Sequence, residues 1–227
     1  MGNIRIQEVK ERIITDNDAV ALRTREDLTK KKVFFVNLMS SPGAGKTTLL
    51  AGTIKRLSGT YRIGVLEADV DSDVDARAVY EAGARVIQLH TGGSCHMDAD
   101  MTVRGLEALD VSDLDLVFLE NVGNLVCPAE FDTGAHKKVM ILSVPEGDDK
   151  PLKYPLMFSV SDLLIVNKTD TLPVFDFSFD ALSKNLGQVN PTIPMIRLCA
   201  LDGSGFDKWI DYLETEIAAF KGSKGEQ

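Results

Sequence analysis

The chain has 227 residues, of which 44% are hydrophobic and 26% charged, so it can bury one full core. Lys and Arg number 25 against 34 Asp and Glu, and the formal net charge of −9 argues against general binding of nucleic acid or of an anionic membrane. No apolar run approaches the roughly 20 residues of a membrane-spanning helix. The number of cysteines is odd, at three, and we see no secretion-signal pattern, so we do not expect a disulfide framework. We therefore expect a cytoplasmic protein without a membrane or nucleic-acid partner.

Two kinds of hydrophobic pattern divide the chain. Apolar residues at helical spacing predict a helix over 3–30, which the basic run Lys30–Lys32 closes as a solvated linker. Beyond it, short apolar runs alternate with amphipathic stretches. We predict strands at 33–39, 63–67, 85–89, 114–120, 138–143, 163–167 and 195–198, and helices at 47–58, 74–82, 98–109, 151–159, 177–188 and 205–220. This alternation predicts an α/β fold, with a doubly wound, mostly parallel sheet and helices on both faces. We divide the chain into an N-terminal helix and linker at 1–32, a P-loop domain at 33–220 and a flexible tail at 221–227.

A phosphate-binding loop follows the first predicted strand and opens a helix. Ser40–Thr48 reads S-S-P-G-A-G-K-T-T and matches G-x-x-x-x-G-K-[ST], except that Ser40 replaces the first glycine. The alternative is a Gly-rich turn with a chance lysine, and the strand, loop and helix context argues against it.

Each position of this loop has an expected role. Lys46 would bridge the β- and γ-phosphates and Thr47 would ligate Mg²⁺. By resemblance to other loops of this type, Thr48 would contact the α-phosphate. Backbone N–H groups would turn toward the phosphates at Gly43, Ala44 and Gly45.

Carboxylates at two strand ends are candidates for magnesium binding and for activating water. Glu120 begins E-N-V-G, where GTPases usually carry D-x-x-G, and Gly123 would let the backbone approach a γ-phosphate. Asp69 ends the second strand and Asp75 begins the next helix, so either could sense Mg²⁺ or prime water. A helix-start role is the alternative for Asp75. No clear arginine finger is visible, so we predict slow hydrolysis.

Cys95, His96 and Cys127 form a candidate metal site. Both cysteines are predicted in loops after strands, where they could meet, and two thiolates with an imidazole suit Zn²⁺ or Ni²⁺. Spacing alone favours two buried cysteines and a surface histidine. The position of Cys127, shortly after Gly123, is the reason to keep the metal site as a hypothesis, because a metal held there would be coupled to the γ-phosphate sensor.

A guanine-reading tetrapeptide, Asn167–Asp170, follows another apolar strand. The carboxylate of Asp170 can accept from both N1–H and the 2-amino group of guanine, whereas adenine would leave it facing an acceptor. Asn167 can bond the purine edge and tie loops together, and the stem of Lys168 can lie over the base. Later, Cys199-Ala200 occupies the place of a Ser-Ala-Lys-like loop beside the base.

Three functions stay open from these residues. The first is a GTPase metallochaperone, the second a P-loop kinase or ATPase with incidental thiols, and the third a non-catalytic metal-binding scaffold with a vestigial loop. The base reader separates the first from the second, and GTP turnover separates the first from the third.

From about residue 33 to 215 the chain closely resembles the HypB family, the hydrogenase nickel-incorporation GTPases of the SIMIBI class. The resemblance is carried by the phosphate loop, by 91–98, by 120–128, by 146–150 and by the base reader. It implies a GTPase, with a GTP-promoted homodimer, that delivers nickel during [NiFe]-hydrogenase maturation. It also implies a metal site at the dimer interface built by Cys95, His96 and Cys127.

The resemblance further implies two partners, a HypA-type nickel metallochaperone that docks on the N-terminal helix and the hydrogenase large-subunit precursor. Two departures stand out, because the Cys-rich N-terminal site and the His-rich stretch of some members are not present, so tight nickel storage is not expected. The sister family that assists urease lacks the run Asn124–Pro128.

Overall fold

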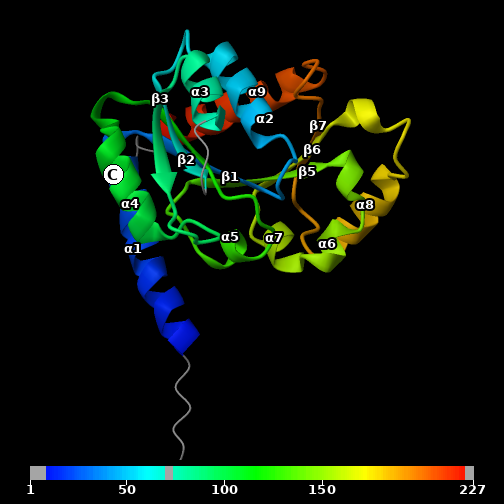
Figure 1. The fold of residues 1–227 in the computed structure, drawn as a ribbon, viewed down its shortest axis with the longest axis horizontal. Coiled ribbons are helices and arrows are strands. Elements are labelled where there is room, and N and C mark those ends of the chain that lie inside the picture. Colours follow the sequence, from blue (N-terminus) through cyan, green and yellow to red (C-terminus); the bar gives the residue numbers. More distant parts are fainter. Residues whose placement is uncertain (1–8, 70–73, 223–227) are drawn as a thin grey trace, which may run out of the picture.

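Seven parallel strands form the centre of the protein (Figure 1). The structure is a computed structural model that describes residues 9–69 and 74–222, without the side chains of 9–13, 69 and 74–76. The strands are β1 (Phe34–Ser40), β2 (Ile63–Asp69), β3 (Arg85–His90), β4 (Leu116–Glu120), β5 (Lys137–Ser143), β6 (Leu163–Asn167) and β7 (Met195–Arg197). Their order is β3-β2-β4-β1-β5-β6-β7, and every pair in the sheet is parallel. The predicted doubly wound α/β fold is confirmed.

Helices cover both faces of the sheet (Figure 1). On one face lie α2 (Lys46–Leu57), α3 (Val74–Glu81) and α9 (Phe206–Gly222), whose apolar residues form one core with the strands. The other face carries α1 (Val9–Lys31) and α4 (Ala99–Leu109) over one half of the sheet. Over the other half lie α5 (Cys127–Glu130), α6 (Lys150–Lys153), α7 (Pro155–Ser159) and α8 (Phe179–Gly187).

Burial on both faces explains the continuous apolar strands. Every residue of β1 is buried; Phe34, Val36 and Leu38 belong to one core, whereas Phe35 and Met39 belong to the cores of the opposite face. A strand covered on both sides has no face that favours polar residues, so the alternating pattern of a half-exposed strand disappears.

Two helical segments differ from the prediction. The helix expected at 151–159 is two short helices, because the chain leaves helical geometry at Tyr154 (φ −129°, ψ 56°), the residue before Pro155, and proline disfavours helical geometry in its predecessor. Cys127 was expected in a loop but begins the single turn of α5, where Pro128 has a φ suited to a helix start.

The ends of the chain also refine the expected boundaries. Lys30 and Lys31 form the last turn of α1, where positive charge favours the helix dipole, so only Lys32 of the expected linker lies outside the helix. α9 continues to Gly222. Residues 1–8 and 223–227 lie outside the described residues, and none of the described helices is long and apolar enough to cross a bilayer.

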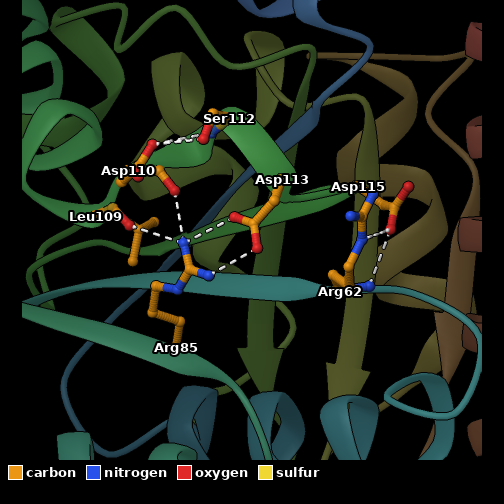
Figure 2. A network of polar contacts seen from close by, with 7 residues as sticks. All are labelled: Arg62, Arg85, Leu109, Asp110, Ser112, Asp113 and Asp115. Carbon is orange, nitrogen blue, oxygen red and sulfur yellow. Dashed lines mark hydrogen bonds and ion pairs between the residues drawn. The ribbon is translucent and has the colours of Figure 1, made fainter.

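A polar network closes the edge of the sheet where β2 and β3 begin (Figure 2). The Arg85 guanidinium donates to both carboxylate oxygens of Asp113 at 2.9 Å and to the carbonyls of Leu109 and Asp110. Beside it, Arg62 pairs with Asp115 at 3.0 Å. These groups are largely exposed, so they tie the turn after α4 to the sheet and contribute little to stability. The carboxyl ends of the strands lie on the opposite side of the sheet, and the sequence motifs lie there.

His136 connects β1, α1 and α9 from a half-buried position. Its Nδ1 accepts from the backbone N–H of Phe35 at 3.0 Å, its Nε2 lies 2.9 Å from the Thr29 hydroxyl, and its ring contacts the rings of Phe34 and Phe220. A proton on Nδ1 would face the Phe35 N–H. Burial, and then the charge of Arg25, lower the pKa of His136 to about 4 from an ordinary 6.5.

We expect His136 to make the fold acid-sensitive between pH 6.5 and about 4. In that window the unfolded chain binds a proton that the folded chain does not, so stability falls as pH falls, by on the order of 1–2 kcal/mol at pH 5. Urea denaturation at pH 7 and pH 5 measures this loss. His136→Asn keeps an acceptor for the Phe35 N–H and should lose less on acidification; an equal loss in both proteins would contradict the assignment.

Candidate nucleotide and metal site

The sequence motifs gather at the carboxyl edge of the sheet. Ser40, Glu120 and Asn167 are the last residues of β1, β4 and β6, three strands of the central part of the sheet. Ligands of doubly wound sheets bind at this edge, where the strand order reverses around the first strand. The fold therefore brings together motifs that lie more than a hundred residues apart in the chain.

Left-handed glycines shape the phosphate loop. Gly43 and Gly45 have φ of 73° and 96°, and a side chain at Gly45 would place its Cβ 2.5 Å from Nδ2 of Asn167. Only glycine combines that backbone geometry with that close approach. The backbone N–H groups at the start of α2 are thereby free to face phosphate oxygens.

Ser40, which replaces the usual glycine at the start of the loop, contacts the lysine of the loop. Its side chain is fully buried, its hydroxyl donates to the Ser41 carbonyl at 2.6 Å, and it accepts from Nζ of Lys46 at 3.0 Å. The lysine is thus held at the loop, with its charge directed at the place where phosphates would lie.

Thr47 and Glu120 meet in the same pocket. The Thr47 hydroxyl donates to Oε1 of Glu120 at 2.7 Å, and the carboxyl group is buried. Both line a cavity of about 570 Å³ together with Lys46 and Gly123. A hydroxyl and a carboxylate side by side are the hard oxygen ligands that Mg²⁺ prefers, so these residues fit the ion that accompanies a nucleoside triphosphate.

Gly123 approaches the phosphate loop closely. A Cβ at this position would lie 2.9 Å from the backbone N and Cα of Pro42. The segment after β4 therefore lies against the loop that would hold the phosphates, as the prediction of a γ-phosphate sensor requires.

Glu146 supports the phosphate loop from the 3-10 turn that follows β5, and the site prediction missed it. The Ser41 hydroxyl donates a hydrogen bond to Oε1 of Glu146, while Oε2 accepts from the backbone N–H and the hydroxyl of Ser143 at 2.7 and 2.6 Å. Ser143 and Glu146 form a capping box, and the S-x-x-E spacing was a signal for it. Its contact with Ser41 is a tertiary contact that the spacing does not predict.

The base reader lies beside the phosphate loop. Nδ2 of Asn167 donates to the Ala44 carbonyl at 2.9 Å and Oδ1 accepts from the Ala200 N–H at 3.0 Å, so Asn167 ties the two loops together as predicted. Nζ of Lys168 donates to the Gly43 carbonyl at 2.6 Å. These contacts define a pocket of about 210 Å³.

Asp170 faces this pocket with Cys199 as its neighbour. The Cys199 thiol lies 3.2 Å from Oδ1 of Asp170, and both residues line the pocket with Ala200. Burial raises the pKa of Cys199, so the sulfur stays a thiol that donates to the carboxylate. The base pocket and the phosphate pocket share Gly45, Thr48 and Lys168 in their walls, so they form adjoining parts of one site.

The three predicted metal ligands meet. Sγ of Cys95 lies 3.0 Å from Sγ of Cys127 and 3.9 Å from Nδ1 of His96, and the three ligand atoms lie within 4.8 Å of one another. The Cys95 side chain is exposed and the other two are half-buried. Three converging ligands with an open side suit a metal that must enter and leave.

The neutral state of His96 also favours metal binding. Burial lowers its pKa, so the imidazole is neutral and can ligate a metal, and the ring stacks on Phe131 with centroids 4.1 Å apart. The contact with Cys95, followed by burial, raises the pKa of Cys127. Binding of a metal to this pair must therefore displace thiol protons.

Asp69 and Asp75 have known backbone positions only. Asp69 is the last residue of β2, in register with His90 of β3, and Asp75 is the second residue of α3. Their side chains lie outside the described part of the structure, so their roles in binding Mg²⁺ or priming water stay predictions.

Known proteins are similar to this chain in sequence and in fold. Residues 34–197 match the family described as CobW/HypB/UreG, nucleotide-binding domain. The hydrogenase maturation factor HypB of Azotobacter chroococcum mcd 1 is 45% identical over 219 residues, which cover 96% of this chain and 72% of that protein. HypB of Helicobacter pylori in complex with nickel (TM-score 0.86, 32% identity, 93% of this chain and 100% of that one) and HypB of Archaeoglobus fulgidus (0.83, 35%, 89% and 99%) have similar structures. The chain belongs to the CobW/HypB/UreG family and, within it, is a HypB-type P-loop GTPase of the SIMIBI class.

Proposed function

We propose that this protein hydrolyses GTP to control nickel delivery during maturation of [NiFe]-hydrogenase, with its nucleotide state coupled to metal binding and dimerisation. Its relatives are hydrogenase maturation factors, and one structural neighbour was solved with nickel. The observation that carries the proposal is a direct hydrogen bond between the segment that follows Glu120 and the loop that carries Cys95 and His96.

Asn121 makes this connection. It is buried between Glu120 and Gly123, its Oδ1 accepts from the Met97 N–H at 3.3 Å, and its Nδ2 donates to Oδ1 of Asn37 at 3.2 Å. Met97 is the residue after His96. A shift of Asn121 on binding a γ-phosphate would therefore act on the metal loop through its backbone.

A second link reaches the other side of the metal site. Nδ2 of Asn124 lies 3.4 Å from the Cys95 carbonyl, and its Oδ1 accepts from the Val126 N–H at 2.8 Å, immediately before Cys127. Both ligand-bearing segments thus contact 120–124. An element contacted by two ligand sites, with two arrangements, is the physical requirement for coupling between them.

In the nucleotide site, Lys46 would stabilise charge on the transferred phosphate, and Thr47 and Glu120 would hold Mg²⁺, which neutralises charge on the phosphates when bound. The residues described as lining the phosphate pocket include no arginine. This supports slow hydrolysis by the isolated protein. Asp69 and Asp75 remain candidates for positioning water.

The open metal site supports a dimer. Three ligands from one chain leave a tetrahedral zinc or square-planar nickel site incomplete, and the exposed side chain of Cys95 is accessible to a second copy. We propose a GTP-promoted homodimer that binds Ni²⁺ or Zn²⁺ at this interface, in the cytoplasm. The proposed partners are a HypA-type metallochaperone that docks on α1 and the hydrogenase large-subunit precursor.

Replacing Asp170 by Asn tests whether the protein selects guanine nucleotides. An amide can accept from N1–H but cannot also accept from the 2-amino group, so GTP affinity should fall by about 10²-fold. Xanthosine triphosphate carries an oxygen at that ring position and should bind the variant more tightly than it binds the native protein. Titration with fluorescent analogues of both nucleotides measures the two effects.

The exposed Asp176 provides the control, because Asp176→Asn makes the same chemical change outside both pockets. Unchanged GTP affinity in Asp170→Asn, with the fold retained, would favour the alternative of a kinase or ATPase with incidental thiols.

A further inference from the structure

A buried asparagine of the N-terminal helix touches both segments that carry metal ligands. Asn17 lies in α1 and is 8% exposed. Its Oδ1 accepts from the backbone N–H of Ala99 at 2.8 Å, and its Nδ2 donates to the Asp132 carbonyl at 2.9 Å. The side chain therefore connects the stretch that contains Ala99 to the stretch that contains Asp132, and it belongs to neither.

The first stretch leads from Cys95 and His96 into α4. Ala99 is the first residue of that helix, so its N–H has no acceptor within the helix. The N-cap side chain of Asp98 accepts from Met101, and Asn17 supplies the acceptor for Ala99. Asn17 thus fixes the end of the loop that presents the first two ligands.

The second stretch leads from Cys127 through α5 to Asp132. Phe131, the neighbour of Asp132, stacks on the His96 ring. Anchoring the Asp132 carbonyl therefore holds the surface on which His96 rests, as well as the chain that leaves Cys127. The two hydrogen bonds of Asn17 set the separation of the segments that must converge on one metal.

Further contacts hold α1 on the second stretch. Arg25 donates to the Ala135 carbonyl at 2.9 Å and pairs with the Asp132 carboxylate at 2.7 Å. At Gly134 (φ 81°) a Cβ would lie 2.8 Å from the Ala21 carbonyl. These contacts pack the helix, whereas Asn17 also reaches the start of α4, which follows the loop that carries Cys95 and His96.

We infer that Asn17 is a positioning residue for the metal site, through which helix α1 controls the spacing of Cys95 and His96 relative to Cys127. The inference rests on the proposed metal-binding function. The N-terminal part of α1 projects from the body of the molecule (Figure 1). A protein that binds there is connected to the metal ligands by one buried amide.

The test compares Ni²⁺ binding by the full chain with Asn17→Ala and Asn17→Asp. Outer residues that orient metal ligands typically change affinity by 10–100-fold, so Asn17→Ala should weaken Ni²⁺ binding at least about tenfold. It should also alter the thiolate-to-nickel charge-transfer absorption, which reports ligand geometry. Asn17→Asp keeps an acceptor for Ala99 but sets a carboxylate oxygen against the Asp132 carbonyl, so it should also weaken Ni²⁺ binding.

Arg25→Ala is the matched control, because it loosens α1 without removing the bridge. It should lower the thermal midpoint but leave Ni²⁺ affinity and absorption unchanged. The inference is overturned if Asn17→Ala binds like the native protein, or if Arg25→Ala weakens binding as much. If Asn17→Ala does not fold, Asn17→Asp decides alone, and native-like binding by it overturns the inference. Failure of the native chain to bind Ni²⁺ would instead refute the proposed function.

Discussion

Lys46→Ala is expected to reduce GTP turnover by at least about 10²-fold. In the structure the lysine is buried and lies 3.0 Å from the Ser40 hydroxyl, at the base of the phosphate pocket. Its positive charge is placed to stabilise negative charge that develops on the transferred phosphate. Loss of a single preorganised donor of this kind typically costs about 10²–10³-fold in turnover.

The fold should survive this change, because the amine is replaced by a small side chain and its described partner is a hydroxyl that water can satisfy. Release of phosphate under saturating GTP measures turnover, and circular dichroism confirms folding. Lys55→Ala removes an exposed lysine from the same helix and should turn over like the native protein. Turnover in Lys46→Ala close to the native rate would show that hydrolysis occurs elsewhere or by contamination.

Local sequence patterns predicted most of the fold and most of the candidate site residues. The phosphate loop, the base reader and the three metal ligands each lie in a short stretch, and their chemistry depends on residue types at fixed spacing. The parallel fold then places the ends of β1, β4 and β6 at one edge, so the prediction that the motifs meet followed from the strand pattern.

Contacts between distant segments were not predictable in the same way. Asn17 and Ala99 are far apart in sequence, as are Ser41 and Glu146, and neither pair has a spacing that signals contact. Asparagine in a helix reads as an exposed polar residue, and only the packing of α1 against α4 buries it. The helical turn at Cys127 was missed because four residues are too few to show a helical period.

The second large effect concerns the metal site. Replacing Cys127 by Ala should abolish stoichiometric binding of Ni²⁺ or Zn²⁺, because one of the two thiolates is lost. If about 10–16 kcal/mol of binding free energy is shared among four ligands, each accounts for about 3 kcal/mol, or on the order of 10²-fold in affinity. Cys95→Ala should behave alike, since its sulfur lies 3.0 Å from that of Cys127.

Metal content after dialysis, together with competition against a chromophoric chelator, measures this loss. Cys199→Ala removes the third cysteine, which is buried beside Asp170, and should retain full metal binding in the absence of nucleotide. Stoichiometric binding that persists in both Cys95→Ala and Cys127→Ala would exclude the site.

The proposed coupling between nucleotide and metal depends on Asn121 and Asn124, which join the segment after β4 to both ligand-bearing stretches. The most direct test is the Ni²⁺ affinity and molecular mass of the native chain with GDP and with a non-hydrolysable GTP analogue, each with Mg²⁺. Couplings of about 1–3 kcal/mol change affinity about 5–150-fold. We predict a change of at least about fivefold between the two states, with dimers in the GTP state. Equal Ni²⁺ affinity and equal mass in both states, with both nucleotides bound, would contradict the proposal.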